Sequence, residues 1–352
     1  MLADRIEGKW IDAFESVLAL CRVQRGEAVA ILSETQSRAV NVQLAELALH
    51  RLGARAFHVV VPTPAQRAPV AVRSTGASDA VGGLKPVVAA LASAGLVVDL
   101  TVEGMLHAPE LKDILKGGAR LLMVSNEHPE ALERLAPNGA DGPALEAKVK
   151  AGVKRLKAAK TMRVISAAGT DLTIRVEGAE PGGVWGWCDR PGSVAHWPGG
   201  LVLCFPRAGS VNGRLVLAPG DANLTFKRYV ESAVAMTIAD DYVTAIDGAG
   251  VDAAMMRDYI AAWGDRNAYA VSHVGWGMNP KARWEALAMY DKRDTNGTEL
   301  RAIAGNFLYS TGANETAGRF TLGHFDLPLR ACTVTLDGAV VVEQGRLVGE
   351  LG

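Results

Sequence analysis

The sequence lacks the features that mark several specialised classes of protein. It has four cysteines but no CxxC pair, which argues against a zinc ribbon or a disulfide framework and predicts reduced thiols in the cytoplasm. No segment approaches the roughly 20 consecutive apolar residues of a membrane span. The net charge is −1 and no long run carries one sign, so we expect neither nucleic acid nor a membrane among its partners.

Phosphate-binding loops are missing as well. No GxGxxG follows the first expected strand and no GxxxxGK[ST] occurs, so we predict no nucleotide site. Instead, residues 1–160 alternate short β-branched runs with helical patterns, as in "EAVAILSET", "SRAVNVQLAELALHRLG" and "RAFHVVVP". Such alternation predicts an α/β domain, a parallel sheet with helices. The Pro-, Gly- and Ser-rich loop at 61–83 is long enough for a lid or an oligomer contact, and we expect a homo-oligomer.

The pattern changes after residue 160. Strand-like runs separated by turns dominate, and "ACTVTLDGAVVVEQGRLVG" contains two of them joined by Asp-Gly, a strong hairpin signal. A helical segment, "GVDAAMMRDYIAAWGD", interrupts these strands. We therefore predict two domains, an α/β domain over residues 1–160 and a β-rich α+β domain over residues 161–352.

The segment "FTLGHFDLPLR" places His324 and Asp326 two residues apart in an apolar strand, where both side chains point to one face. Ionised groups in apolar surroundings are costly unless they are paired or bind a metal. One interpretation is a His–Asp hydrogen bond at the end of a strand. The other adds His273 from "YAVSHVGWGMNP", because two imidazoles and a carboxylate make up the facial triad of non-haem Fe(II) oxygenases. Composition alone leaves both open.

The seven histidines divide into two groups. Four stand among glycines or prolines at the ends of regular elements, where functional residues concentrate: His107, His196, His273 and His324. The other three have nothing nearby that makes a site, and we interpret them as structural: His50, His58 and His128.

The C-terminal half resembles the metal-dependent aminopeptidases typified by the thermophilic leucyl aminopeptidases. The resemblance rests on four segments in the same order: "WPGGLVLCFP", "VSHVGWGMNP", "GNFLYSTG" and "GHFDLP". At three positions where that family has metal ligands, this chain has Leu201, His273 and Leu308. The resemblance thus implies that one metal is lost, and that one site of His273, His324 and Asp326 remains in the second domain. Two-metal hydrolysis needs both ions, so we do not expect peptidase activity.

Within that superfamily the whole chain resembles the 2,5-dihydroxypyridine 5,6-dioxygenases of nicotinate breakdown. The matching motifs are "GMLHAPE", "SVAHWPGG", "VSHVGWGMNP", "LYSTG" and "GHFDLPLR". The resemblance implies a dioxygenase that opens the ring of 2,5-dihydroxypyridine with O2 and gives N-formylmaleamate. It also implies Fe(2+) bound by His273, His324 and Asp326, with His107 as the catalytic base.

The remaining predictions concern the substrate pocket. Ser310 follows Leu308 by two residues, so in a strand both face the same side. We predict that the Ser310 hydroxyl binds a substrate oxygen and that Leu106, Leu201 and Leu308 line an apolar pocket for a flat ring. His196 is expected to bond the substrate and is the second candidate for the base. No arginine occurs within the matched metal segments, so we expect none to clamp a substrate carboxylate.

Three alternatives stay open. A two-metal aminopeptidase with a rearranged site, a dioxygenase for another hydroxypyridine, and an inactive binding protein would all fit parts of the pattern. Metal content helps to separate them, because two metal ions per chain are expected for the first, one iron for the second and none for the third. The sequence does not fix which hydroxypyridine is used.

Overall fold

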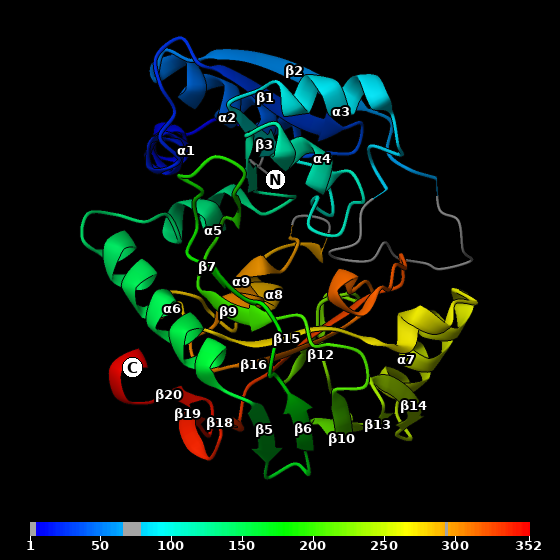
Figure 1. Ribbon diagram of the computed structural model, residues 1–352. Helices are drawn as coiled ribbons and strands as arrows, with labels where there is room; N and C mark the ends of the chain where they lie inside the picture. Colours follow the sequence, from blue (N-terminus) through cyan, green and yellow to red (C-terminus); the bar gives the residue numbers. More distant parts are fainter. Residues whose placement is uncertain (1–4, 66–78, 293–294) are drawn as a thin grey trace.

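The computed structural model describes residues 5–65, 79–292 and 295–352, so most of the expected lid or contact loop at 61–83 lies outside the described residues. The first half contains a parallel sheet in the order β2-β1-β3-β4-β8 (Figure 1). Its strands are β1 (Ala28–Glu34), β2 (Arg55–Val61), β3 (Leu96–Asp99), β4 (Arg120–Met123) and β8 (Val194–His196). The predicted α/β architecture is confirmed.

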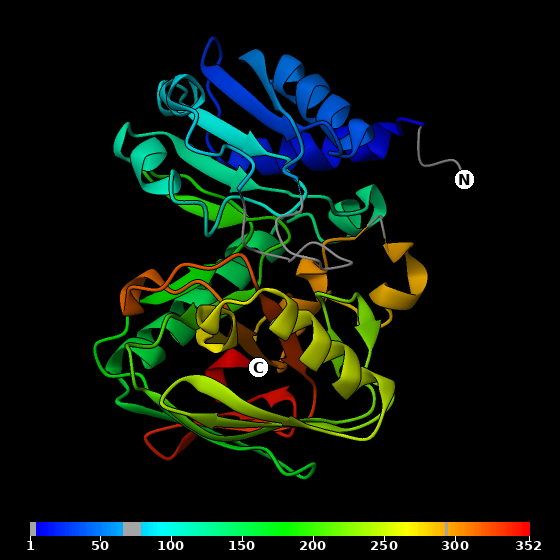
Figure 2. The same ribbon diagram turned by 90° about the vertical axis from the view of Figure 1, so that its right-hand side faces the viewer.

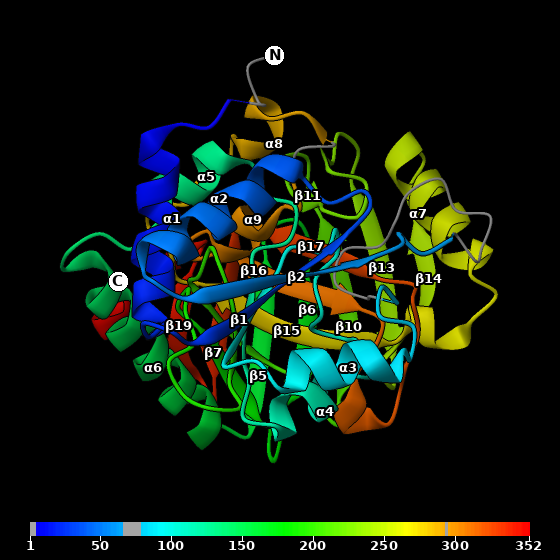
Figure 3. The same cartoon turned by 90° about the horizontal axis from the view of Figure 1, so that it is seen from above.

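Helices cover both faces of this sheet because its central strands are apolar on both sides. Ile31 of β1 packs with the first two helices, and its neighbour Leu32 packs with the next two. The helices are α1 (Gly8–Leu20) and α2 (Ala39–Arg51) on one face, and α3 (Lys85–Ala92) and α4 (Leu111–Lys116) on the other (Figure 2). Seen from above, α2 and α3 lie on opposite sides of β1 (Figure 3).

The second half is built on antiparallel sheets. The larger sheet has the order β14-β13-β10-β6-β5-β18-β19-β20. Its strands are β5 (Thr161–Ser166), β6 (Asp171–Arg175), β10 (Val211–Leu217), β13 (Val234–Ala239), β14 (Tyr242–Asp247), β18 (Cys332–Leu336), β19 (Ala339–Glu343) and β20 (Arg346–Leu347). The expected Asp-Gly hairpin joins β18 to β19 through Asp337 and Gly338.

A smaller five-stranded sheet, in the order β17-β16-β15-β9-β7, lies between the larger sheet and the first half (Figure 1). Its strands are β7 (Pro181–Val184), β9 (Leu201–Cys204), β15 (Val271–Gly277), β16 (Phe307–Thr311) and β17 (Phe325–Leu329). Alternate residues such as Trp276, Tyr309 and Phe325 pack into the core shared with the larger sheet. The residues between them therefore face the opposite way, toward the parallel sheet.

The other elements connect or flank these sheets. They are α5 (Pro129–Arg134), α6 (Asp141–Ala158), β11 (Ala222–Asn223), β12 (Arg228–Tyr229), α7 (Val251–Ala262), η1 (Arg266–Tyr269), α8 (Ala286–Met289), α9 (Thr298–Ala302), η3 (Glu315–Ala317) and η4 (Gly349–Leu351). The helix expected in "GVDAAMMRDYIAAWGD" is α7. The division at residue 160 stays a prediction about folding units, and β8 departs from it because residues 194–196 return to pair with β4.

Two structural facts concern the disulfide framework and the membrane span that the sequence argued against. The four cysteines are buried and free: Cys21, Cys188, Cys204 and Cys332. None of the helices in the described ranges has the length and apolar character to cross a membrane.

Candidate active site

Three neighbouring strands of the smaller sheet carry polar side chains on the face that points away from its core. His273 lies on β15, Ser310 on β16 and Asp326 on β17, and Ser310 is directly opposite Asp326 in the strand register. The alternation of strand side chains explains the placement, since Tyr309 and Phe325 beside them point into the core. These three residues, called the polar set below, therefore lie within hydrogen-bonded strands and not in loops.

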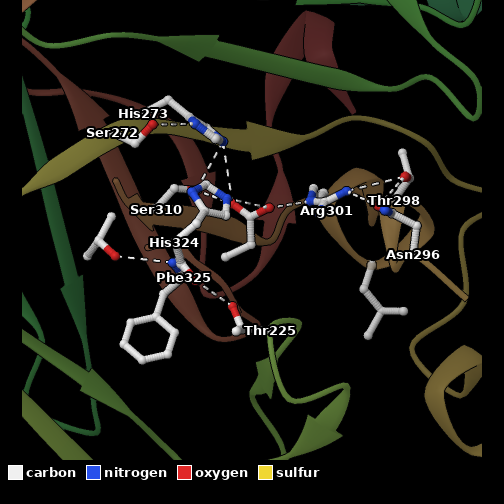
Figure 4. Close-up of polar contacts among 12 residues, drawn as sticks. Thr225, Ser272, His273, Asn296, Thr298, Arg301, Ser310, His324 and Phe325 are labelled. Carbon is white, nitrogen blue, oxygen red and sulfur yellow. Dashed lines mark hydrogen bonds and ion pairs between the residues drawn. The ribbon is translucent and has the colours of Figure 1, made fainter. Parts of the chain in front are cut away.

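His324 immediately precedes β17 and joins this set, as the spacing of two residues predicted. Its Nε2 lies 3.3 Å from Asp326 Oδ2, and His273 Nε2 lies 3.5 Å from Asp326 Oδ1. The backbone is held by Thr225, whose hydroxyl donates to the His324 carbonyl oxygen at 2.8 Å (Figure 4). Neither ring nitrogen of His324 has a hydrogen-bond partner of acceptable geometry among the described residues.

The electrostatics of the site favour a neutral His273 imidazole and an ionised Asp326 carboxylate. Burial lowers the pKa of His273 to about 4, and the nearby charge of Asp326 only partly opposes this. Burial would raise the pKa of Asp326, but Arg301 and the two histidines together hold that pKa well below its ordinary range. Metal ligation requires these same protonation states.

The Asp326 carboxylate is also bonded by neighbouring side chains. Ser310 donates its hydroxyl hydrogen to Oδ1, and the same hydroxyl lies 3.0 Å from His273 Nε2. On the other side, Arg301 Nε donates to Oδ2 at 2.5 Å (Figure 4). Each carboxylate oxygen has two lone-pair positions, so these bonds leave acceptor capacity for a metal ion.

The described chain contains no ready-made group of three metal-ligating side chains. In the His273, His324 and Asp326 set, the carboxylate contacts the two imidazoles directly. A metal ion would replace these contacts, and the 3.3 and 3.5 Å separations show that the three side chains already lie close enough to share one ion. Neither ring nitrogen of His324 makes a well-formed hydrogen bond to the described residues, which also fits such a role, because buried polar atoms usually make one.

His107 approaches this set from the parallel sheet. It follows β3 in a loop that Asp99 organises: Asp99 Oδ1 accepts from the Thr101 amide at 3.0 Å and Oδ2 from the Met105 amide at 2.8 Å. The carboxyl ends of parallel strands are where ligands gather in open α/β sheets. His107 lies at such an end, as predicted from the sequence.

The His107 ring is surrounded by rings of the second half of the chain. Its centroid lies 5.7 Å from that of His324, 6.0 Å from that of His273 and 5.8 Å from that of Phe205. Burial, followed by the two neighbouring histidines, holds the pKa of His107 well below its ordinary value. Its Nε2 is buried and bonded to no described residue. A neutral imidazole with a free nitrogen can accept a proton.

His196 lies at the end of β8, another carboxyl end of the parallel sheet. Burial lowers its pKa to about 3, and the charge of Arg301 is the next cause. The structure therefore brings His107 and His196 into one cavity with His273, His324 and Asp326.

The cavity between the two sheets encloses about 220 Å³. That is below the roughly 300–1,000 Å³ of pockets for drug-sized ligands, and it suits a single ring. Its walls are mainly apolar and include the predicted Leu106 and Leu201, together with Leu203 and Phe205.

Two predicted pocket residues are placed behind the wall rather than on it. Leu308 is fully buried and packs against Leu201 and Leu203. Ser310 is also fully buried, and its hydroxyl is engaged with Asp326 and His273. Their roles toward a substrate stay predictions, and the contacts instead make Ser310 a support for the polar set.

The sequence reasoning missed Arg301. It lies in α9, outside the motif "GNFLYSTG", yet it contributes to the cavity wall and bonds Asp326. The matched metal segments contain no arginine, as noted from the sequence, and Arg301 reaches the cavity from outside them. Asn296 and Thr298 also line the cavity and bond Arg301. A search for arginines near the matched segments, rather than within them, would have found it.

Comparison with known proteins decides the family. The family model described as 2,5-dihydroxypyridine 5,6-dioxygenase matches residues 9–349. The 2,5-dihydroxypyridine 5,6-dioxygenase of Pseudomonas putida KT2440 is 37% identical over 341 residues, which is 95% of each chain. The chain belongs to the 2,5-dihydroxypyridine 5,6-dioxygenase family. The resemblance inferred from the motifs is confirmed.

Solved structures agree. The structure of the Pseudomonas putida KT2440 dioxygenase superposes with a TM-score of 0.90 at 35% identity, covering 97% of this chain and 98% of that one. Wild-type AmpT from Thermus thermophilus gives a TM-score of 0.65 at 14% identity, covering 97% of this chain and 99% of that one. The second likeness concerns the fold alone, and it confirms the predicted aminopeptidase-like fold.

Proposed function

We propose that this protein opens the ring of 2,5-dihydroxypyridine between C5 and C6 with O2, giving N-formylmaleamate, and that its cofactor is Fe(2+). The observation that carries the proposal is the set of two imidazoles and one carboxylate facing His107 across a small apolar cavity, in a chain of this family. Both oxygen atoms of O2 enter the product, so no external reductant is needed.

His273, His324 and Asp326 would hold the iron. Their composition is that of sites that keep positions open for substrate and O2. Bound there, Fe(2+) supplies the one-electron chemistry that lets O2 react with an aromatic ring. Ser310 and Arg301 fix the orientation of the Asp326 carboxylate from its two sides.

His107 would remove a proton from a ring hydroxyl and so raise the electron density of the ring. Its depressed pKa keeps it neutral at physiological pH, and Nε2 is available to take the proton. His196 would bond a substrate oxygen from the neighbouring strand end. The apolar side chains Leu106 and Leu201 would hold the flat ring and exclude water from it.

The two leucines at former ligand positions favour one metal over two. Leu201 and Leu308 belong to one apolar cluster with Leu203, so the space that a second ion would need is filled with hydrocarbon. This packing argues against the aminopeptidase alternative, although the fold is shared with AmpT.

The test is anaerobic reconstitution with Fe(2+), followed by O2 uptake with a panel of hydroxypyridines. We expect one iron per chain, one O2 consumed per ring with 2,5-dihydroxypyridine, and N-formylmaleamate by mass spectrometry. A Zn2+-loaded sample is the matched control and should be inactive. No O2 uptake with 2,5-dihydroxypyridine by a fully iron-loaded sample would overturn the proposal, and uptake with another hydroxypyridine would replace the substrate.

We also infer a cytoplasmic location, supported by the four free cysteines. The homo-oligomer stays a prediction that light scattering would test.

A further inference from the structure

Arg301 occupies an unusual position between the two halves of the molecule. Its Nε donates to Asp326 at 2.5 Å, and its Nη1 donates to Asn296 Oδ1 at 2.9 Å and to Thr298 Oγ1 at 3.2 Å. The side chain retains 10% of its exposure and forms part of the cavity wall. Its remaining nitrogen, Nη2, makes no hydrogen bond to the described residues.

The first half of the chain fixes the short helix that carries Arg301. Glu127 accepts from the Thr298 amide at 2.5 Å and from the Asn296 amide at 3.3 Å. Arg134 binds Glu299 through both carboxylate oxygens, at 2.6 and 2.8 Å. A guanidinium held in this way loses little further freedom when it binds a ligand, because its planar fork is already oriented.

His107 and Arg301 both line the cavity, but their contacts differ. His107 lies against the rings of His324, His273 and Phe205. Arg301 is bonded to Asp326, Asn296 and Thr298 instead. The two side chains are therefore held independently and can each bond a different oxygen of one bound ring.

We propose that Arg301 is a further substrate-binding residue, whose Nη2 bonds the ring oxygen that lies para to the hydroxyl attended by His107. This inference rests on the proposed function. In 2,5-dihydroxypyridine the oxygens at C2 and C5 are para to each other, so they project from opposite sides of the ring. The C2 oxygen has carbonyl character in the pyridone tautomer and is a strong acceptor for a guanidinium. Arg301 thereby favours rings that carry the C2 oxygen over rings that lack it.

The experiment measures anaerobic dissociation constants by calorimetry on the Fe(2+)-loaded protein with three ligands. These are 2,5-dihydroxypyridine, 2-hydroxypyridine, which keeps the C2 oxygen, and 3-hydroxypyridine, which lacks it and keeps the oxygen equivalent to C5. In Arg301→Met we expect the first two to bind about 10- to 100-fold more weakly, as for a lost hydrogen bond to a charged group. Binding of 3-hydroxypyridine should change by less than about threefold.

Arg301→Lys keeps the charge and guards against loss of folding, which circular dichroism checks. We expect an intermediate loss for the two ligands with the C2 oxygen. Iron per chain is measured in every sample, so a weakened metal site is recognised. Equal weakening for all three ligands would overturn the inference and reduce Arg301 to a positioning residue for Asp326. Failure of the proposed function would show differently, as absent turnover in the unaltered protein.

Discussion

The two walls of the cavity are built in different ways. The smaller antiparallel sheet contributes side chains from within paired strands, such as His273 on β15 and Asp326 on β17. The parallel sheet contributes His107 from the loop after β3 and His196 from the end of β8. Strand pairing directly fixes the side chains of the antiparallel sheet. The positions of His107 and His196 depend instead on the hydrogen bonds that hold the loops after their strands.

This difference assigns different tasks to the two walls. We call the wall formed by the antiparallel strands the strand wall, and the wall formed at the ends of the parallel strands the loop wall. Metal ligands must keep fixed mutual distances, and strand pairing fixes a ligand such as Asp326 against its supporting neighbour Ser310. A catalytic base must approach a substrate that enters and leaves the cavity. Residues in the loops that follow strands are suited to this role, because loops on a rigid scaffold commonly carry catalytic residues. Damage to the strand wall should therefore remove the metal, while damage to the loop wall should spare the metal and affect turnover.

The largest expected effect comes from the strand wall. Alanine at His273, His324 or Asp326 should abolish turnover and strongly reduce bound iron, because each removes one ligand. Iron per chain by mass spectrometry and O2 uptake are the measurements. The matched control is His50→Ala, since His50 is an exposed histidine on α2. Full iron occupancy in all three variants would end the assignment of the site.

His107→Ala is the corresponding change in the loop wall. We expect it to retain its iron and to lose about 10²- to 10⁴-fold in kcat, as for removal of a general base. The acid-side limb of the pH profile, which we place below pH 6.5 because burial depresses the pKa of His107, should disappear. An unchanged pH profile would transfer the role to His196 or to solvent, and lost iron would contradict the separation of the walls.

The sequence predicted the polar residues of the strand wall, but it did not predict Arg301, which supports Asp326. The period of two in "GHFDLP" was enough to bring His324 and Asp326 together, since side-chain direction in a strand follows from local geometry alone. Arg301 could not be reached in this way. Its place depends on contacts from Glu127 and Arg134, which lie far away in the chain and across the interface between the sheets.

Ser310→Ala tests a support within the strand wall. The variant removes the hydroxyl that donates to Asp326 and lies 3.0 Å from His273. We expect iron affinity to fall about 10- to 100-fold, as for loss of a group that orients metal ligands. Chelator competition measures it. If iron affinity is unchanged while substrate affinity falls, Ser310 contacts the substrate as the sequence suggested. If neither changes, the hydroxyl has no role in the site.

The smallest effect on activity, and the one with a distinct pH signature, is expected from Asp99→Asn in the loop wall. Burial raises the pKa of Asp99 from its ordinary 3.8 to about 6, although bonds from Thr101 and Met105 oppose this. Between these values the folded state holds a proton that the unfolded state has released. The stability that Asp99 contributes is therefore present below pH 3.8 and is lost as pH rises through about 6.

An asparagine side chain at this position cannot titrate, so the variant lacks this dependence. The free energy of unfolding of the metal-free protein, minus that of Asp99→Asn, should fall by about 1.4 kcal/mol per pH unit between roughly pH 4 and 6. Urea unfolding at several pH values measures both curves, and their difference cancels the other groups. The amide also lacks a second acceptor oxygen for the Met105 amide, so kcat should fall modestly while bound iron stays unchanged. A constant difference across this pH range, or lost iron, would show that Asp99 does not hold the His107 connection in the way proposed.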